Sequence, residues 1–562
     1  MKKQSTKRGS KQAAPFAKNE EIILEISDMG NEGEGIGKLE GYPFFVKDAI
    51  PGDVIRAGVL KAKASYGYAR VIEILTPSDN RIEPKCPVAK ACGGCQIQHM
   101  QYPAQLAFKQ DKVANCIQRI GGISPEKYVM EDIIGMEEPW HYRNKAQFPV
   151  AASTDGKLVT GFYAGRSHRI IPCAHCFIQA DGTEEICRTV VGFMESYGVP
   201  AYDEKTHSGL VRHIMLRKSK ESGRFLVCLV INGDKLTHAE EFVQMLRDAA
   251  DTESVCLNVN TRPGNAILGD EIIPLYGPPC LMDSIGGIRY QISPLSFYQV
   301  NPIQTERLYE TALEYAGLTG GETVWDLYCG IGTISLFLAR KAGKVYGVEI
   351  VPDAIRDAKE NARRNGITNA EFFVGAAEDV VPQKYQESSG SVKADVVTLD
   401  PPRKGCDAKL LETVIAMKPQ RIVYVSCDPA TLARDLKVLT AGGYRLERVR
   451  CVDMFPQGGH VETVVQLSLK KDAPKIEVTM EPEEESYYTP EEKATYPKIR
   501  EYVKGKYGVD VHTSYIAEVK RMCGLEMGQN YNKSKKENPV VRNCPQEKVV
   551  YIKDALRYYG LI

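Results

Sequence analysis

Hydrophobic and polar positions alternate through residues 20–76, which is the pattern of half-buried β-strands. Glycines and the pair Pro51-Gly52 interrupt the alternation, and these residue types are typical of tight turns. Several short strands separated by turn residues predict a small closed β-barrel, to which we assign residues 19–78.

From about residue 297 the pattern changes to short apolar runs separated by helical stretches. This alternation predicts a doubly wound parallel sheet, and hence an α/β fold, for residues 291–472. The expected strands are residues 323–327, 344–349, 371–374, 394–399 and 421–425. Residues 79–290 combine helical and strand patterns, which indicate a central α+β domain.

The two ends of the chain are basic although the formal net charge is zero. Residues 1–18 carry six Lys or Arg and no acid, and residues 493–562 carry fourteen basic and seven acidic residues. We predict a disordered basic tail at 1–18, an acidic linker at 473–492 and a basic helical module at 493–562. Basic ends are typical of nucleic-acid binding, and the alternative is a solvated tail that only keeps the protein soluble.

The composition excludes membrane and secreted classes of protein. Hydrophobic residues make up 43% and charged residues 26%, as in soluble globular chains, and no apolar run is long enough to span a membrane. The first residues lack the apolar core of a signal peptide, so we expect a cytoplasmic protein. Its sixteen cysteines are then expected to be thiols, metal ligands or a nucleophile rather than disulfides.

Cys427 occupies the most informative position in the chain. It follows the apolar run 422–425 and precedes Asp428-Pro429, a pair that starts helices. We therefore expect it at the carboxyl ends of the strands, where open α/β folds bind ligands. A helix amino terminus also favours a thiolate, as a nucleophile requires. The alternative is a small buried apolar cysteine.

Two further segments predict a site for a methyl donor. Residues 324–333, Val-Trp-Asp-Leu-Tyr-Cys-Gly-Ile-Gly-Thr, form a strand, a glycine-rich turn and a helix start, and the next strand ends at Glu349, an acid suited to the ribose hydroxyls of adenosine. Together they resemble the first two motifs of a class I S-adenosylmethionine methyltransferase. A nicotinamide enzyme is the alternative, although the third glycine of a dinucleotide motif is replaced by Ser335.

The fourth predicted strand ends in Asp-Pro-Pro-Arg-Lys-Gly, residues 400–405. Methyltransferases that act on exocyclic amines carry an aromatic residue after Asp-Pro-Pro, so Arg403 favours chemistry at a ring carbon; a plain turn is the alternative. Methylation at C5 of a pyrimidine requires a thiolate that adds to C6 and a base that removes the C5 proton. Cys427 and Glu462 are the expected pair, and His460 is a rival base.

Five motifs in series resemble the RNA uracil-5-methyltransferase family, over about residues 20–470. They begin at Phe297, Asp326, Asp400, Val425 and His460. The resemblance implies that Cys427 is the nucleophile and Glu462 the base. It also implies that S-adenosylmethionine is bound by Gln299, Tyr328, Gly330, Glu349 and Asp400. Tyr328 stands where many members have Phe, a change that keeps an aromatic face.

A cysteine-rich segment contains Cys86, Cys92 and Cys95, and Cys173 and Cys176 add a second CxxC pair. By spacing alone, the two CxxC pairs would suit a tetrahedral zinc site. The family resemblance implies instead a [4Fe-4S] cluster on Cys86, Cys92, Cys95 and Cys176, with Cys173 as an extra cysteine. Free thiols are a third alternative. Because methylation needs no redox step, we expect a structural or RNA-positioning role for the cluster.

The glycine-rich stretch 33–41 and Ile-Pro-Gly-Asp-Val at 50–54 resemble the TRAM domain, an RNA-binding barrel. The barrel and the cysteine cluster favour 23S ribosomal RNA as the partner, because family members that act on transfer RNA generally lack both. We therefore predict a monomeric 23S ribosomal RNA (uracil-5-)-methyltransferase. We expect the C-terminal module, which the resemblance does not cover, to add phosphate contacts to RNA.

Two other functions remain open at this stage. One is an RNA-binding or assembly factor built on an inactive methyltransferase fold, against which the intact Cys427 and Glu462 argue. The other is a cytosine-5 methyltransferase, whose cysteine usually follows a proline, whereas here Ser426 precedes the cysteine.

Overall fold

The computed structural model describes residues 15–470, except 154, 166, 174 and 388–392, and residues 496–523, 525 and 544–559. Residues 1–14 of the predicted basic tail and the whole predicted acidic linker lie outside the described residues. The chain divides into two compact units, Met1–Lys475 and Ile476–Ile562. Within the described ranges, no helix is long and apolar enough to cross a membrane.

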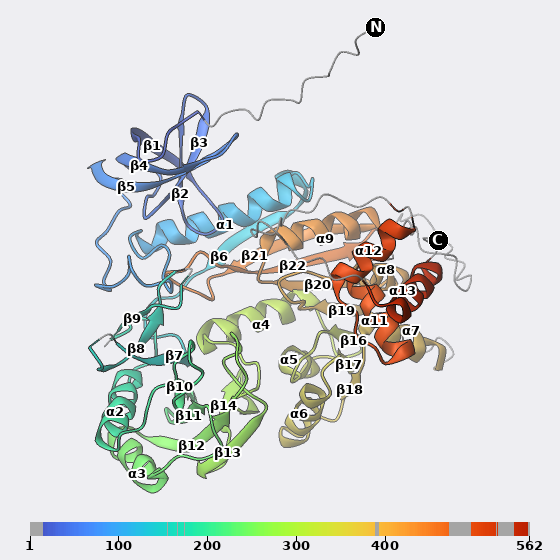
Figure 1. The fold of residues 1–562 in the computed structure, drawn as a ribbon. Helices are drawn as coiled ribbons and strands as arrows, with labels where there is room; N and C mark the ends of the chain where they lie inside the picture. The colour runs from blue at the N-terminus through green and yellow to red at the C-terminus, as the bar shows by residue number, and fades with distance from the viewer. Residues whose placement is uncertain are drawn as a thin grey trace. The chain divides into compact units, whose positions relative to one another are not determined.

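The first domain is a closed five-stranded barrel, which confirms the prediction (Figure 1). Its strands are β1 (Glu21–Met29), β2 (Gly35–Leu39), β3 (Tyr42–Lys47), β4 (Val54–Ala62) and β5 (Gly67–Thr76), joined in the order β1-β2-β3-β5-β4. Ile22, Leu24 and Ile26 of β1 are buried and alternate with exposed residues. The period of two in the sequence therefore separates the inside of the barrel from its surface.

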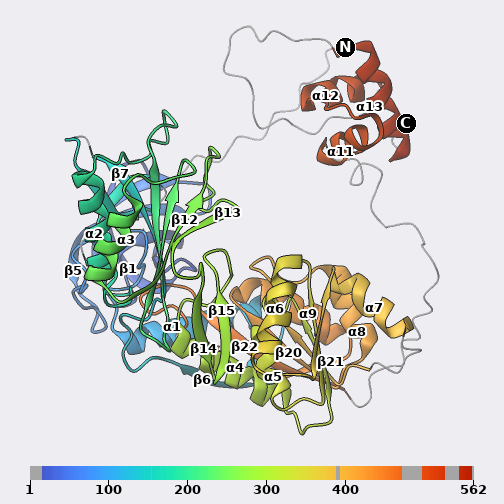
Figure 2. The same ribbon diagram turned by 90° about the horizontal axis from the view of Figure 1, so that it is seen from below.

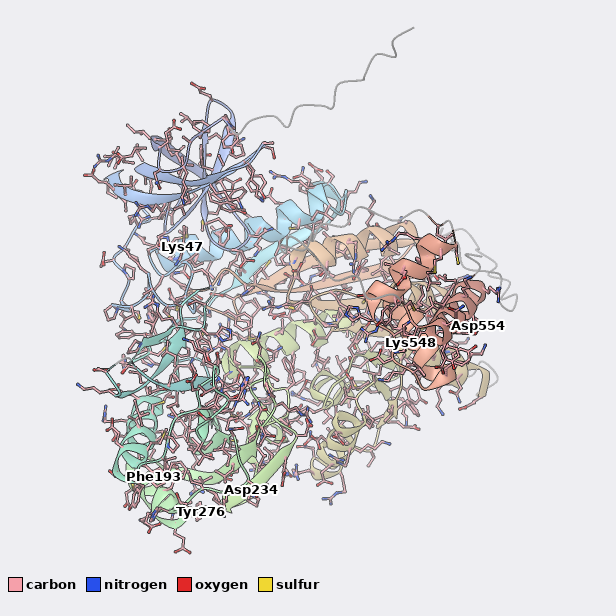
Figure 3. The ribbon with its side chains drawn as sticks, in the orientation of Figure 1. Lys47, Phe193, Asp234, Tyr276, Lys548 and Asp554 are labelled. Atoms are coloured by element: carbon pink, nitrogen blue, oxygen red, sulfur yellow. The ribbon has the colours of Figure 1, made fainter. Side chains whose placement is uncertain are left out.

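The central region contains a seven-stranded sheet, in the order β13-β12-β11-β10-β7-β8-β9. Its strands are β7 (Lys145–Ala152), β8 (Leu158–Tyr163), β9 (Ile170–Pro172), β10 (Val211–Lys218), β11 (Phe225–Ile231), β12 (Thr252–Val259) and β13 (Glu271–Tyr276). Helices α2 (Thr183–Ser196) and α3 (Ala239–Ala249) pack together through Phe193, labelled in Figure 3, and Phe242, whose ring centroids are 4.8 Å apart.

An eight-stranded sheet forms the body of the second half, in the order β18-β17-β16-β19-β20-β22-β21-β6. Its strands are β16 (Thr323–Leu327), β17 (Lys344–Glu349), β18 (Ala370–Val374), β19 (Val396–Leu399), β20 (Arg421–Ser426), β21 (Tyr444–Val452), β22 (Glu462–Leu469) and β6 (Val129–Ile134). The five strands from β18 to β20 are parallel, as predicted, and β22 is antiparallel to β20.

Helices cover the two faces of this sheet (Figure 1), and a hydrophobic core lies on each face. One core contains α4 (Pro302–Ala316), α5 (Thr333–Ala339) and α6 (Pro352–Arg364) with the strand pair β14 (Leu281–Ile285) and β15 (Ile288–Ile292). The other contains α1 (Tyr102–Arg119), α7 (Ala377–Glu387), α8 (Ala408–Met417) and α9 (Pro429–Ala441). Helices on both faces make this a doubly wound α/β fold.

The sheet includes residues from far earlier in the chain. Helix α1 packs on α9, and β6, which follows the short helix η1 (Pro125–Lys127), pairs in parallel with β21 at the sheet edge. Both elements lie within residues 79–290, the segment in which the sequence predicts a separate central domain. Figure 2 shows the seven-stranded and eight-stranded sheets as distinct layers, with β14 and β15 between them.

The second unit contains the helices α11 (Tyr496–Tyr507), α12 (Thr513–Met522) and α13 (Gln546–Tyr558). They share a core of Ile499, Val503, Ile516, Val519 and Ile552. Asp554 of α13, labelled in Figure 3, accepts hydrogen bonds from the Tyr507 hydroxyl at 2.7 Å and from Lys506 Nζ at 2.8 Å, which ties α13 to α11.

Candidate active site

The parallel strands carry the predicted site residues at their carboxyl ends. From β16 the chain passes to β17 and β18 on one side, and later to β19 and β20 on the other. Doubly wound sheets bind ligands at such a reversal of strand order. Tyr328 follows β16, Glu349 ends β17, Asp400 follows β19 and Cys427 follows β20, so the topology brings them to one edge.

Cys427 and Glu462 meet because β20 and β22 are paired antiparallel strands. The last pair in the register is Ser426 of β20 with Thr463 of β22. Cys427 and Glu462 are the next residues along the two strands. Glu462 is 5% exposed and Cys427 is half-buried. The nucleophile and the base predicted from the sequence are therefore neighbours in the fold, although 34 positions separate them in the chain.

The electrostatic surroundings of Cys427 differ from the sequence prediction. Burial first, and then the charges of Glu462 and Asp400, raise the pKa of the Cys427 thiol to about 11; the positive charge of Arg403 and a backbone hydrogen bond oppose this effect. The expected lowering by the helix amino terminus is wrong for the protein without ligands. The Asp428 carboxylate already accepts the first free amides of α9, from Ala430 and Thr431 at 2.9 and 3.0 Å.

Two carboxyl groups, those of Glu462 and Asp400, act on the thiol, and a third, that of Asp326, acts on Asp400. Burial, followed by the charge of Asp400, raises the pKa of Glu462 to about 8. Burial and the charge of Asp326 raise the pKa of Asp400 to about 7. Sequence reasoning assigned no role to Asp326, whose carboxylate accepts hydrogen bonds from the hydroxyls of Ser335 and Thr398, the latter at 2.8 Å. A signal was available, since an acid inside a buried strand is rare.

The donor side of the site is organised by backbone amides. The two oxygens of Glu349 accept hydrogen bonds from Val351 N at 3.0 Å and from Gly330 N at 3.3 Å, so the glycine-rich turn and the acid are held together. Tyr328 has a φ of 72°, and its amide donates to the Val348 carbonyl at 3.0 Å. A tyrosine in this left-handed conformation is unusual and is often found at functional sites.

Gln299 lies on the segment between β15 and α4, where its carbonyl accepts a hydrogen bond from Asn144 Nδ2 at 3.2 Å. The described residues give its side chain no hydrogen-bond partner. Sequence reasoning missed the apolar pair Ile350 and Val351, which follow Glu349 and are 67% and 48% exposed. Phe297, the first residue of one sequence motif, is 75% exposed. Exposed apolar side chains beside a ligand site are candidates to pack on flat rings.

His460, the rival base, lies between β21 and β22, two residues before Glu462. Burial and the nearby charge of Arg403 lower the pKa of the His460 imidazole. The Arg403 side chain is itself exposed, and the described residues offer its guanidinium no hydrogen bond or ion pair.

The five cysteines of the two CxxC segments come together around one cavity of about 400 Å³. Cys92 Sγ accepts a hydrogen bond from Gly94 N at 3.4 Å. Burial raises the pKa of the Cys86 thiol. A hydrogen bond from the Cys173 thiol, and then the backbone amides of Ile178 and Gln179, lower the pKa of Cys176 to about 7. Cys173 Sγ also donates to the His175 carbonyl. Within the described residues, no group of three or more Cys, His, Asp or Glu could hold a metal ion.

Comparison with known proteins shows what the chain is similar to. A model of the tRNA (Uracil-5-)-methyltransferase family matches residues 284–470, and a TRAM domain model matches residues 15–72. An RNA methyltransferase of Halalkalibacterium halodurans, itself described as uncharacterized, is 49% identical over 462 residues, which are 82% of this chain and 100% of the relative. A protein of the same description from Clostridium tetani is 47% identical over 83% of this chain and 100% of the relative.

A solved structure with the same fold is the tRNA (uracil-54, C5)-methyltransferase of Pyrococcus abyssi in complex with S-adenosyl-L-homocysteine. It is 27% identical with a TM-score of 0.64, covering 79% of this chain and 100% of that protein. S-adenosyl-L-homocysteine is what S-adenosylmethionine becomes when it has given up its methyl group, so the neighbour supports S-adenosylmethionine as the donor. The chain belongs to the RNA uracil-5-methyltransferase family and carries an N-terminal TRAM domain.

Proposed function

We propose that this protein methylates C5 of a uridine in 23S ribosomal RNA, with Cys427 as the nucleophile and Glu462 as the base. The observation that carries the proposal is the pairing of β20 with β22, which sets the two side chains at facing strand ends beside the donor-side loops. This arrangement argues against an inactive methyltransferase fold. A thiol beside the buried carboxyl group of Glu462, which has no hydrogen-bond partner among the described residues, is typical of a catalytic site.

The proposed reaction has three steps: addition, methyl transfer and elimination. The Cys427 thiolate adds to C6 of the uracil, and the electron pair of the C5–C6 double bond moves to give an enolate. C5 then attacks the methyl carbon of S-adenosylmethionine, whose bond to sulfur breaks with the electron pair left on sulfur. Glu462 takes the C5 proton, the double bond re-forms and the C6–S bond breaks, which returns the thiolate. S-adenosylmethionine supplies an electrophilic methyl group and a sulfonium charge.

The raised pKa values bear on how this cycle starts. Glu462 has a pKa of about 8 and Cys427 one of about 11, so both hold their protons at neutral pH in the free protein. A cation brought close to them favours both charged forms. We infer that the positive charge of the bound donor, added to that of Arg403, lowers both pKa values and prepares the thiolate only when the donor is present.

The donor residues follow from the same geometry. Glu349 is proposed to accept hydrogen bonds from the ribose hydroxyls, with Gly330 supplying close backbone approach and Ile350 a face for the adenine. Tyr328, Gln299 and Asp400 are proposed to line the rest of the donor site. Asp400 supports this role because it is a half-buried acid with no hydrogen-bond partner among the described residues, so its carboxyl group is free to face a bound cation.

We also propose a [4Fe-4S] cluster on Cys86, Cys92, Cys95 and Cys176. All five thiols line a space of about 400 Å³. Within the described residues no three of them come together as the ligands of a single zinc ion would, which favours a larger group over one zinc. Cys176 is preferred over Cys173 because the Cys173 thiol, and after it the amides of Ile178 and Gln179, donate to the Cys176 sulfur, an arrangement that stabilises a thiolate ligand. The cluster would cross-link the segments around the cavity.

Iron and sulfide analysis of anaerobically purified protein tests the cluster, together with its visible spectrum. We expect Cys176→Ala to lose iron and the matched variant Cys173→Ala to keep it. A colourless wild-type protein that contains one zinc would refute the cluster, and iron loss only in Cys173→Ala would reverse the assignment.

The choice of 23S ribosomal RNA rests on the TRAM domain and the cysteine cavity. The alternative partner is transfer RNA, on which the Pyrococcus abyssi neighbour acts. Methylation of unmodified 23S ribosomal RNA and of transfer RNA transcripts by the same preparation decides between them. We expect methyl transfer to 23S ribosomal RNA, and preferential methylation of transfer RNA would refute this choice.

A trapping experiment tests the chemistry independently of the target. Fluorine at C5 cannot leave as a proton, so RNA containing 5-fluorouridine should form a covalent complex with the wild type that survives denaturation. Cys427→Ala should form none. If Glu462→Gln turned over normal RNA at the wild-type rate, His460 would become the base.

A further inference from the structure

The loop that leads into the base is held in place by a buried polar network. This segment, the base loop (residues 453–461), connects β21 to β22 and ends directly before Glu462. Its Gln457 is 2% exposed and has a φ of 69°, a backbone conformation that residues other than glycine rarely adopt. Such a residue persists only where surrounding contacts fix it.

Helix α1 supplies the first set of contacts. Tyr102, Gln105, Lys109 and Lys112 are spaced three or four residues apart and therefore share one helix face. The Tyr102 hydroxyl donates to Asp453 Oδ2 at 2.9 Å, and Lys109 Nζ donates to Asp453 and to the Phe455 carbonyl at 3.0 Å.

The remaining two residues of this face contact the second half of the base loop. The side-chain amide of Gln105 donates to Gln457 Oε1 at 2.9 Å and accepts from Gln457 N at 3.0 Å. Lys112 Nζ donates to the Gly459 carbonyl at 3.0 Å and to the Asn31 carbonyl of the barrel at 2.8 Å. A single helix face therefore contacts the base loop along its length.

The cysteine segment supplies a second set of contacts. The amides of Gln96 and Ile97, directly after Cys95, both donate to the Gln457 carbonyl, at 3.0 and 3.1 Å. The Gln96 side-chain oxygen accepts from Gly459 N at 3.3 Å. The base loop is therefore bonded to the segment that carries three of the proposed cluster ligands.

Stability alone is a poor reason for this network. The side chains of Lys109 and Asp453 are fully buried. Removing two charges from water costs about as much as their attraction returns, so an apolar pair would serve a core equally well. The charged pair differs from an apolar pair in that its hydrogen bonds require a defined geometry, which fixes the position of the loop backbone.

We propose that Tyr102, Gln105, Lys109 and Gln96 are positioning residues that place Glu462 opposite Cys427, and that Gln96 links the cysteine segment to the base. The inference rests on the proposed function, since it takes Glu462 as the base. Through Gln96 and the base loop, the cysteine segment would then affect how fast Glu462 removes the C5 proton.

Two mild substitutions test the proposal. Gln96→Ala removes the acceptor for Gly459 N, and Tyr102→Phe removes the hydroxyl that bonds Asp453. Displacement of a catalytic group by about 1 Å can cost on the order of a hundredfold in rate, so we expect kcat to fall about 10- to 100-fold. The KM values for RNA and S-adenosylmethionine should change less than about twofold, because neither residue faces the donor loops.

The defining result is a covalent intermediate on ordinary uridine RNA. When the C5 proton is removed too slowly, the methylated adduct accumulates and appears as a protein–RNA band on a denaturing gel, which the wild type should not show. Gln96→Glu keeps an acceptor for Gly459 N and should restore kcat. Gln110→Ala is the matched control, since Gln110 lies on α1 but bonds Ile133 N of β6 at 2.8 Å.

Amide hydrogen exchange gives a readout that does not depend on activity. In Gln96→Ala, the amides of residues 457–459 should exchange faster than in the wild type, while iron content stays the same. The proposal is overturned if kcat of both variants stays within about twofold of the wild type, or if the loss appears in KM without an adduct on uridine RNA.

The trapping experiment separates this proposal from the proposed function. If the wild type forms no complex with 5-fluorouridine RNA, the proposed function fails first. If the wild type forms the complex and Gln96→Ala and Tyr102→Phe turn over normally, only the positioning role is refuted.

Discussion

The proposed site has a donor side around Glu349 and an acceptor side around Cys427 and Glu462. The two sides differ in whether their polar groups have hydrogen-bond partners in the protein. On the donor side, both oxygens of Glu349 accept hydrogen bonds from backbone amides, those of Val351 and Gly330. On the acceptor side, Cys427 and Glu462 are crowded together next to Asp400 of the proposed donor site, and all three have raised pKa values. The polar groups around Glu349 are satisfied before ligand arrives, whereas the acceptor side is completed by ligand.

This difference suggests an order of events. A preformed donor side can bind S-adenosylmethionine first, and its positive charge then favours the anionic forms of the groups on the acceptor side. Substitutions on the two sides should accordingly affect different steps, binding on one and chemistry on the other.

The largest effect is expected from removing the nucleophile. Cys427→Ala should lower kcat by about a thousandfold or more while S-adenosylmethionine still binds, because covalent activation is lost and the donor side is intact. Single-turnover methyl transfer and calorimetric titration of the donor measure the two properties. Cys523→Ala, at the residue directly after α12, is the control. Full activity of Cys427→Ala would contradict the mechanism.

Replacing the base should have the next largest effect. Glu462→Gln should lower kcat by about a hundredfold or more and accumulate the adduct. Because Glu462 acts as the carboxylate and its pKa is raised to about 8, wild-type kcat/KM should increase with pH between about 7 and 9. The pH profile of the variant should lack this rise, and an unchanged profile would remove Glu462 from its role.

On the donor side, Glu349→Ala should weaken binding rather than chemistry. Loss of hydrogen bonds to a charged group corresponds to about a 10- to 100-fold higher Kd for S-adenosylmethionine. At saturating donor, kcat should fall only a few-fold. Glu371→Ala, an exposed acid on the neighbouring strand β18, is the control. A large fall in kcat with unchanged Kd would show that the two sides are not separable.

The smallest effect concerns stability without ligands. The pKa of Glu462 rises from 4.5 to about 8 on folding, so between these pH values the unfolded chain releases a proton that the folded protein keeps. The free energy of unfolding should therefore decrease as pH rises through this window. Glu462→Gln should reduce the decrease, by on the order of 1–2 kcal/mol at pH 8, as measured by denaturant unfolding at pH 5 and pH 8. Equal slopes for both proteins would contradict it.

The sequence predicts the parallel strands closely because each is a short apolar run between helices. The expected strand 344–349 is β17 and the expected strand 421–425 is β20 with one further residue. The same reasoning finds Cys427 and Glu349, since strand ends are local features. The barrel is equally local, with its alternation and its glycine turns within about 60 residues.

Other features depend on contacts between distant parts of the chain. Lys109 reads as an ordinary surface lysine of a helix, yet its partner Asp453 is 344 residues away. The sequence also predicts a lowered pKa for Cys427, because it shows the helix start but not that Asp400, after β19, and Glu462, at the start of β22, lie near the thiol. The burial of Lys109 and the charges around Cys427 can therefore be seen only in the folded protein.

Strand β6 has a consequence for how the protein can be divided. It covers the edge of the catalytic sheet beside β21, although it precedes the family match at 284–470 by some 150 residues. A fragment cut to that match would leave the backbone amides and carbonyls of β21 unpaired on one side, and open strand edges recruit other chains. The smallest soluble catalytic fragment should therefore begin before α1, so that the evolutionary unit is shorter than the folding unit.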